Sequence, residues 1–260
     1  MNPTLKIIPI ALLEAYKKSF STTVEPHFEE LQESEISTGT FSFYTSVSAV
    51  FSSKIEGEDI ELDSFIKHKR LGVQYQPDYT QKIDDLYSAY EFAAANTLTS
   101  QNLLQVHALV TNNILHKSQQ GQLRKGNMFV ITNDGKIEYV AATPDKVIPE
   151  MQKLNEDIDT LLHASLEFNE ILFYASMLHL VFVKIHPFED GNGRTGRLLE
   201  KWFLSQKLGR KAWFIQSEKY YYDLHQTYYS NIRQLGLEYD ELDYSQALSF
   251  LQMLPQSVML

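Results

Sequence analysis

HPFEDGNGRTGR, residues 186–197, is the stretch that says most about the fold of this 260-residue chain. Three of the chain's eleven glycines fall within six of its residues, behind a histidine and two acidic residues, and two arginines are interleaved with them. Read by itself, GNGRTG matches the glycine pattern of a dinucleotide-binding turn, G-x-G-x-x-G. The first question is therefore whether the stretch binds a dinucleotide or forms another kind of phosphate site.

A dinucleotide-binding turn requires a strand before the glycines, a helix after them and a repeated β-α-β pattern. The helix is expected, because RTGRLLEKWFLSQ (194–206) has apolar residues at helical spacing. The β-α-β pattern does not recur, and Glu189 and Asp190 would face the pyrophosphate with no metal to screen them. A P-loop is also excluded, because the chain contains no G-x-x-x-x-G-K-[ST]. The sequence therefore favours a different phosphate site.

The small residues Gly191, Asn192 and Gly193 allow successive backbone N–H groups to converge into an anion-binding nest at the start of a helix. Arg194 and Arg197 are three residues apart, so both lie on one side of the first turns of that helix. They can reach two different phosphates of a polyphosphate chain. This part of the stretch predicts a site for a polyphosphate.

The residues before the nest include a candidate metal ligand and a candidate proton acceptor. Asp190 is a hard oxygen ligand of the kind that suits Mg²⁺, which takes one or two carboxylates together with phosphate oxygens. His186 precedes Pro187, which disfavours helix and holds the histidine in a turn beside the nest. A neutral imidazole there is suited to remove a proton from a hydroxyl near pH 7. Phe188 is expected to anchor the loop in the core.

With every fixed position present, the stretch resembles the signature of the Fic family, H-x-F-x-[DE]-G-N-G-R-x-x-R. The resemblance implies an all-α, Fic-type helical bundle with one β-hairpin flap, and transfer of AMP from ATP to a protein hydroxyl. It also implies a role for each signature residue. His186 would be the general base, Asp190 the Mg²⁺ ligand, Asn192 with the amides around Gly191 and Gly193 the holder of the α- and β-phosphates, and Arg194 with Arg197 the holder of the outer phosphates.

A second motif lies far upstream. SSKIEG (52–57) is by itself typical of a helix end with a solvated glutamate, but it also resembles the family's inhibitory motif, [ST]-x-x-x-E-[GN], through Ser52, Glu56 and Gly57. In the class with this motif N-terminal to the core, the glutamate pairs with the last signature arginine and blocks the position of the γ-phosphate. An arginine–carboxylate pair of this kind is bidentate and charge-assisted. We therefore expect Glu56 to pair with Arg197 and to inhibit the protein.

The secondary-structure pattern is mostly helical. FSFYTSVSAVFSSKIEG (41–57) predicts a buried helix closed by Gly57, and MFVITNDGKIEYV (128–140) predicts a hairpin turning at Asn133-Asp134-Gly135. Further helices are expected over about 81–95, 100–115, from Thr143-Pro144 onward, 168–184, 193–207, 217–234 and 244–253. We expect residues 1–80 to form an N-terminal helical region that includes the inhibitory helix, and residues 81–260 to form the Fic core with the C-terminal helices.

The hairpin at 128–140 falls where the family places its flap, which pairs with a segment of the target protein by strand addition; the alternative is an ordinary surface hairpin. SEKYYYDLHQTYYSNI (217–232) falls where relatives line the adenine pocket, and Tyr228 and Tyr229 match a paired tyrosine there. Aromatic residues at helical spacing also occur in cores, so both interpretations stay open. His179 is expected to be a core histidine.

Composition limits the remaining possibilities. Apolar residues make up 43 % and charged residues 22 %, as in soluble globular proteins, and the net charge of −10 argues against non-specific binding to nucleic acid. There is no cysteine, which excludes thiolate metal sites and fits a reducing compartment. The longest apolar run, 171–185, falls short of a membrane span and contains His179 and Lys184. We expect a cytoplasmic protein without nucleic-acid or membrane partners, and the resemblance leaves a homodimer open.

The sequence thus predicts a protein adenylyltransferase that depends on Mg²⁺ and ATP and modifies a Ser, Thr or Tyr hydroxyl of a target protein docked at the hairpin. Two alternatives use the same site: transfer from another nucleotide, and removal of AMP with Glu56 positioning water. A third is a nucleotide-sensing module with vestigial catalysis. His186 and Asp190 argue against the sensor, because binding alone needs no base.

Overall fold

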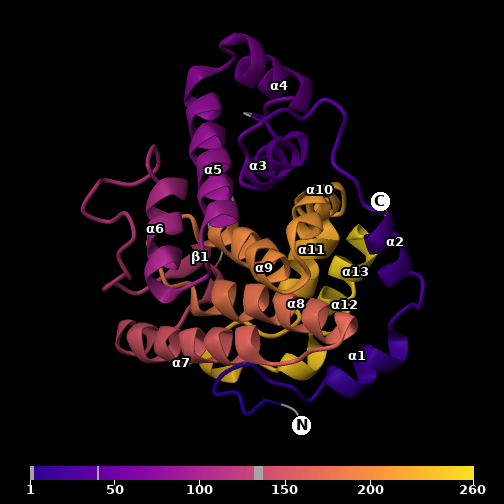
Figure 1. The fold of residues 1–260 in the computed structure, drawn as a ribbon. Helices are drawn as coiled ribbons and strands as arrows, with labels where there is room; N and C mark the ends of the chain where they lie inside the picture. Colours follow the sequence, from indigo (N-terminus) through magenta and orange to yellow (C-terminus); the bar gives the residue numbers. More distant parts are fainter. Residues whose placement is uncertain (1–2, 40, 132–136) are drawn as a thin grey trace.

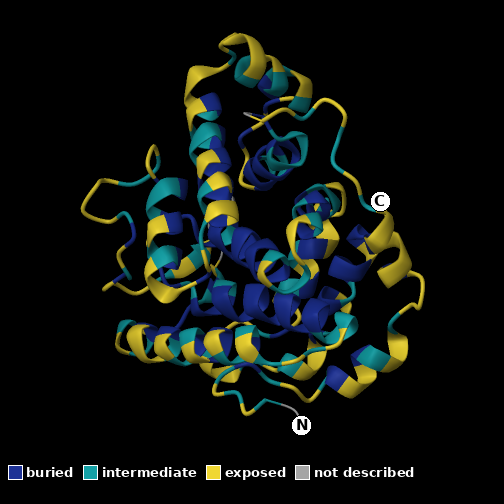
Figure 2. Ribbon diagram, in the orientation of Figure 1, coloured by how far each residue is buried: buried dark blue, intermediate teal, exposed yellow. Residues whose placement is uncertain are grey.

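The computed structural model describes residues 3–39, 41–131 and 137–260, and it is a helical bundle built around one buried helix (Figure 1). This helix, α8 (Phe168–Ile185), is apolar on all sides, and a helix with that pattern must be enclosed by others. It packs antiparallel to α9 (Asn192–Leu208) on one side, and α7 (Pro144–His163) covers another (Figure 1). Figure 2 shows that α8 and α9 are buried along most of their lengths, whereas α7 alternates between buried and exposed residues.

The other helices surround this centre. They are α1 (Leu13–Ser19), α2 (Val24–Glu30), α3 (Phe43–Ile55), α4 (Leu62–Leu71), α5 (Pro77–Ala95), α6 (Ser100–Val110), α10 (Ser217–Asp223), α11 (His225–Arg233), α12 (Leu248–Leu251) and α13 (Met253–Ser257), with short 3₁₀ turns at Arg210–Phe214, Tyr239–Glu241 and Tyr244–Gln246.

The predicted inhibitory helix is α3, which begins at a capped end. The Ser42 side chain accepts a hydrogen bond from the Thr45 amide at 3.2 Å. Gly57 follows the helix with a φ of 95°, a left-handed conformation that glycine adopts without strain. The helix packs against α5 and α10 (Figure 1). The predicted buried helix that Gly57 closes is therefore confirmed.

A buried polar network joins α3 to the core. Lys201 of α9 donates to the Ser48 hydroxyl at 2.6 Å and pairs with Glu218 of α10, which also accepts from the Tyr90 hydroxyl at 2.6 Å. Lys201 and Glu218 are fully buried, and a buried charge pair is tolerated only where its remaining groups are hydrogen-bonded. The network fixes where α3 lies on α9.

The hairpin is the only sheet in the described part of the chain. Strands β1 (Phe129–Ile131) and β2 (Ile137–Val140) are antiparallel, and the predicted turn at Asn133-Asp134-Gly135 lies outside the described residues. The Val140 amide also donates to the Leu237 carbonyl at 2.8 Å, which ties the hairpin to the segment after α11. The predicted fold class, an all-α bundle with one β-hairpin, is confirmed.

Three helix predictions differ from the structure. α6 ends at Val110 rather than near 115, where the Thr111 hydroxyl bonds back to the His107 carbonyl at 2.7 Å. The segment 217–234 is divided at Leu224 into α10 and α11. The segment 244–253 is a 3₁₀ turn followed by short helices, the last of which contains Pro255, a residue that cannot donate to a helix.

Helix α8 begins before the apolar run 171–185 and is longer than that run. The helix has 18 residues with a mean hydropathy of 1.4, so by length and composition alone it could cross a membrane, and the expectation that it falls short was wrong. Within the protein, 83 % of this helix is buried by other elements. Its apolar side chains therefore form the centre of the bundle.

Candidate functional site

The loop between α8 and α9 brings the signature residues together. The chain leaves α8 at His186 with a φ of 53° and enters α9 at Gly191 with a φ of 76°. Both residues are in the left-handed region, which histidine adopts more readily than most residues and glycine most easily of all. A Cβ at Gly191 would also lie 2.6 Å from a methyl group of Thr111. Phe188 is fully buried and anchors the loop.

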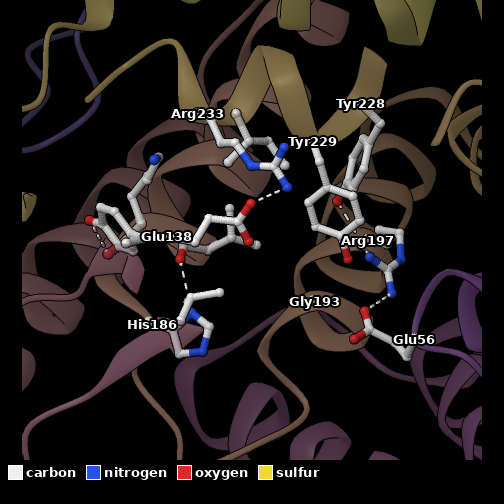
Figure 3. Close-up of a pocket in the computed structure, with 13 residues that line it drawn as sticks. Glu56, Glu138, His186, Gly193, Arg197, Tyr228, Tyr229 and Arg233 are labelled. Atoms are coloured by element: carbon white, nitrogen blue, oxygen red, sulfur yellow. Dashed lines mark hydrogen bonds and ion pairs between the residues drawn. The ribbon is translucent and has the colours of Figure 1, made fainter. Parts of the chain in front are cut away.

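His186 is held as a neutral base. Its Nδ1 lies 3.2 Å from the Val183 carbonyl and donates to it, which leaves the Nε2 lone pair free to accept a proton. The pKa of His186 is lowered from its usual 6.5 to about 4, mainly by burial and in part by the charge of Arg124. The side chain faces a cavity of about 170 Å³ (Figure 3). A proton acceptor is therefore ready in this cavity at neutral pH.

The anion nest at the start of α9 already has a carboxylate against it. A Cβ on Gly193 would lie 2.5 Å from Glu56 Oε1, so the carboxylate occupies the space that the missing side chain leaves. The same oxygen accepts a hydrogen bond from Arg197 Nη2 at 2.6 Å (Figure 3). Burial opposes the ionisation of Glu56, but the positive charges of Arg197 and Arg194 outweigh it and lower its pKa. An ionised carboxylate thus stands where a helix N-terminus attracts anions.

Arg197 is fixed from several directions. Its Nε donates to Ser52 Oγ at 2.9 Å, and its Nη2 donates to the Ser52 carbonyl at 3.0 Å. Its Nη1 donates to the Tyr228 hydroxyl at 3.3 Å. The side chain is 1 % exposed, whereas that of Glu56 is 26 % exposed. The structure therefore brings Ser52, Glu56 and Arg197 together, and Gly57 lies just beyond them.

Tyr228 begins a buried chain of hydrogen bonds. Because its oxygen accepts from Arg197, its O–H is directed to His179 Nε2 at 3.0 Å. His179 Nδ1 then donates to Glu200 at 3.0 Å, and Tyr221 donates to the same carboxylate at 2.9 Å. All four of these side chains are at most 1 % exposed, so the prediction that His179 is a core histidine is confirmed. The hydroxyl of Tyr228 is used to hold Arg197.

The first signature arginine has a glutamate of its own, which the sequence analysis missed. Arg194 Nη2 lies 2.5 Å and 2.6 Å from the two carboxylate oxygens of Glu58. Both residues are buried, at 4 % and 6 % exposed, and burial raises the pKa of Glu58 although Arg194 opposes this. Glu58 is two residues beyond Glu56, and the left-handed turn at Gly57 lets both side chains reach α9. The only signal in the sequence is a second acidic residue after the motif.

Asp190 and Asn192 occupy different settings on the loop. Asp190 is exposed, and its Oδ1 accepts from the Gly191 amide at 2.6 Å. Asn192 is buried, and its amide group bridges the N–H and C=O of Phe188, each at 2.9 Å. A phosphate at the nest would therefore meet the backbone of Asn192 rather than its side chain, which differs from the expected role.

Candidate metal ligands are few. Among the residues that the structure describes, no three His, Asp or Glu side chains lie together as a metal-binding group. A single exposed carboxylate such as Asp190 does not hold a metal alone. It does fit Mg²⁺ when phosphate oxygens and water complete the shell, since Mg²⁺ prefers this mixture of ligands.

The cavity has two chemically different ends (Figure 3). Glu56, Gly193 and Arg197 line one end, and His186 lies across the cavity from Glu56, on the side of Glu138 (Figure 3). The other end is lined by apolar side chains, Val130, Tyr139, Val183 and Ile232, and is bordered by an ion pair between Glu138 of β2 and Arg233 of α11. Tyr228 lines the cavity at the Arg197 end, and Tyr229 lies between the two ends (Figure 3). Its lining suits a molecule that is anionic at one end and flat and apolar at the other.

Comparison with known protein families agrees with this arrangement of the signature residues. The family model described as Fic/DOC family matches residues 97–204, a segment that begins just before α6, includes the hairpin and the whole signature loop, and ends within α9. This segment of the chain matches the Fic family. The matched segment of the Fic domain does not include residues 52–57, so the inhibitory role of α3 stays a prediction.

Several relatives of known name share the Fic domain. "Protein adenylyltransferase Fic" of Nematostella vectensis is 30 % identical over 105 residues, which cover 40 % of this chain and 22 % of the relative. "Uridine 5'-monophosphate transferase" of Xanthomonas campestris pv. campestris (strain 8004) is 35 % identical over 89 residues, which cover 33 % and 16 %. The matches thus span less than a quarter of these two relatives. A crystal structure of a Fic family protein from Desulfovibrio desulfuricans G20 shares the fold, with a TM-score of 0.70 at 20 % identity over all of this chain and 76 % of that one.

His107 is a further buried residue of the Fic domain that the sequence analysis did not single out. Its Nδ1 accepts from the Gly121 amide at 2.9 Å, so its Nε2–H donates to the Asp190 carbonyl at 2.9 Å. Its ring stacks on Phe188 with 3.6 Å between centroids. Burial lowers its pKa to about 4 and keeps it neutral. Because the contact with Asp190 joins residues far apart in sequence, no local pattern reveals it.

We expect His186 to titrate near pH 4 in the free protein. Between pH 6.5 and 4 the unfolded chain binds a proton that the folded chain does not, so His186 makes the folded state less stable as the pH falls through that window. NMR of histidine-labelled protein, recorded from about pH 3.5 to about pH 8, measures the pKa of His186 directly, because this range includes both the usual and the lowered value. A resonance with a midpoint near pH 4 should be missing from His186→Ala, while that of His107 stays. A His186 midpoint near 6.5 would contradict the assigned burial.

Proposed function

We propose that this protein transfers a nucleoside monophosphate from a nucleoside triphosphate to a hydroxyl group of a protein, and that α3 inhibits the transfer. The observation that carries the proposal is the position of Glu56, an ionised carboxylate held against Gly193 and Arg197 in a cavity that the neutral imidazole of His186 also lines. A helix N-terminus with an arginine is a phosphate site. The inhibitory carboxylate occupies the place of a phosphate.

ATP is the nucleotide that we propose. Most of the named relatives are adenylyltransferases, and one is a uridine 5'-monophosphate transferase, so nucleotidyl transfer is common to them while the nucleotide differs. The apolar end of the cavity accepts a flat base between Tyr229 and the hairpin residues Val130 and Tyr139. UTP is the second nucleotide to test.

The proposed transfer reaction uses the residues that line the cavity. His186 Nε2 accepts the proton of a Ser, Thr or Tyr hydroxyl, whose oxygen attacks the α-phosphorus of ATP. The bond from that phosphorus to the bridging oxygen breaks, and diphosphate leaves. The backbone N–H groups at Gly193 and the guanidinium of Arg197 stabilise the negative charge on the phosphates. Asp190 would hold Mg²⁺, which when bound neutralises part of that charge.

We propose that the target protein docks along the hairpin. Phe129, Ile131 and Ile137 are 45 %, 60 % and 53 % exposed, so apolar residues are presented to solvent on both strands. An extended segment can add to such a strand through main-chain hydrogen bonds while its side chains contact these groups. Because β2 is already tied to Leu237 at Val140, the added strand would pair with β1.

Inhibition has an electrostatic cause. A carboxylate and a phosphate have the same sign of charge, so Glu56 must leave Gly193 and Arg197 before a phosphate binds there. Differential binding of this kind changes an affinity or a rate by about 5- to 150-fold, which corresponds to about 1–3 kcal/mol.

Removal of Glu56 should activate the protein. We expect Glu56→Gly to increase the covalent incorporation of label from α-labelled ATP by on the order of 5- to 150-fold, because Arg197 and the nest become free. Glu56→Gly/His186→Ala should incorporate no label, because no base remains. The measurement uses purified protein and a cell lysate with Mg²⁺, and Glu35→Gly, which changes an exposed glutamate, is the matched control.

Each outcome of this experiment has a separate meaning. Equal labelling of wild type and Glu56→Gly would contradict inhibition by α3. Labelling with UTP but not ATP would overturn the choice of nucleotide. Saturable ATP binding without covalent label from either nucleotide, in all variants, would contradict transfer and favour a nucleotide sensor.

Glu58 should limit activity through Arg194. In the Glu56→Gly background we expect Glu58→Gln to raise the transfer rate by about tenfold, equivalent to about 1.4 kcal/mol, because the neutral amide releases the guanidinium for a phosphate. Glu61→Gln, which changes an exposed glutamate paired with Lys54, is the control. A lower rate for Glu58→Gln would show instead that the pair holds Arg194 where the reaction needs it.

A further inference from the structure

We propose that Arg124 is a positioning residue for the transfer reaction: its guanidinium fixes the loop that carries His186 and the two ends of the hairpin as one unit. This inference rests on the proposed function. Arg124 lies in the segment between α6 and β1 and is 3 % exposed. Its side chain donates to four backbone carbonyls.

The first set of contacts surrounds the base. Arg124 Nε donates to the His186 carbonyl at 2.7 Å, and its Nη2 lies 3.3 Å from the Ile185 carbonyl. Its own backbone amide donates to the Pro187 carbonyl at 2.9 Å. Arg124 thus binds three consecutive carbonyls, and the middle one belongs to a residue with a φ of 53°. A non-glycine residue keeps a left-handed conformation only where its surroundings enforce it.

The second set of contacts reaches both ends of the hairpin. Nη1 donates to the Gly126 carbonyl at 2.7 Å, shortly before β1, and Nη2 donates to the Ala142 carbonyl at 2.5 Å, shortly after β2. The Ala141 amide donates to the Met128 carbonyl at 3.1 Å and closes the same end of the hairpin. The guanidinium therefore lies between the base-bearing loop and the hairpin and bonds to both.

This arrangement matters because the two substrates are held by different elements. The hairpin is the proposed docking strand for the target, whereas the signature loop holds the nucleotide and the base. Nε2 of His186 reaches the target hydroxyl only if the loop and the hairpin keep a fixed relation. A displacement of about 1 Å between reacting groups can lower a rate by about 100-fold.

Only arginine suits this position. Its planar guanidinium has five N–H donors spread over a fork, whereas the donors of lysine radiate from a single atom. The charge is also costly, since burial lowers the pKa of Arg124 and its hydrogen-bond acceptors are neutral carbonyls. A residue that only filled space would not need this charge.

The kinetic test compares Arg124→Lys and Arg124→Ala in the active Glu56→Gly background. We expect kcat for transfer to the target to fall by about 100-fold in both, while the KM for ATP stays that of the parent. Added guanidinium ion should restore part of the activity of Arg124→Ala and none of that of Arg124→Lys, whose amine occupies the space. Arg210→Ala, which changes an exposed arginine paired with Glu33, should leave both constants unchanged.

Hydrogen exchange of the wild-type chain and Arg124→Lys gives a second readout that needs no activity. Peptides covering 185–190 and those covering 126–131 and 137–142 should gain exchange together, while peptides within α9 keep their protection. If exchange rises in one of these regions only, or a kcat loss comes with an equal loss of ATP affinity, the proposal is overturned. If Glu56→Gly itself transfers no label, the proposed function fails, and joint exchange of the loop and hairpin still decides the role of Arg124.

Discussion

The contact of the Glu56 carboxylate with Gly193 and Arg197 is the interaction on which the rest of the site depends. It joins the C-terminal end of α3 to the N-terminal end of α9, and it requires glycine at position 193 because a Cβ there would lie 2.5 Å from the carboxylate oxygen. The same features make a phosphate site: an exposed backbone at a helix N-terminus and a fixed guanidinium. In the proposed function, a single set of groups would therefore serve both inhibition and nucleotide binding, and the two would exclude each other.

The two partners of this contact differ in how many groups hold them and in how far they are buried. Arg197 is bound by Ser52 and Tyr228, and α3 is held to the core by the buried network of Lys201 and Glu218. Glu56 is the more exposed partner, at the end of the helix. Movement of its side chain alone would clear the phosphate position and leave α3 in place. The low pKa of Glu56 keeps it charged at neutral pH, so a competing phosphate, rather than protonation, is the expected cause of release.

Local patterns predicted the fold class, the hairpin strands, the helix that Gly57 closes and the burial of His179, because each follows from periodicity, turn residues or composition. Residues whose roles depend on contacts across the chain were not found. Glu58 meets Arg194 across 136 residues of sequence and Arg124 meets His186 across 62. Likewise, the sequence predicted Tyr228 to line an adenine pocket. Only the tertiary structure shows that its hydroxyl accepts a hydrogen bond from Arg197. The partners of Arg124 are backbone carbonyls, which cannot be identified from the sequence because every residue has one.

The most direct test of this account is a pair of crystal structures, of wild type and of Glu56→Gly, each with Mg²⁺ and a non-hydrolysable ATP analogue. In the variant, we expect a phosphate of the analogue to lie against the Gly193 backbone and Arg197. The adenine ring should lie at the apolar end of the cavity, and Asp190 should bind the metal. In the wild type, that phosphate should be displaced from Arg197 by Glu56. A variant structure with the phosphates away from Gly193 and Arg197, or identical phosphate positions in both proteins, would contradict it.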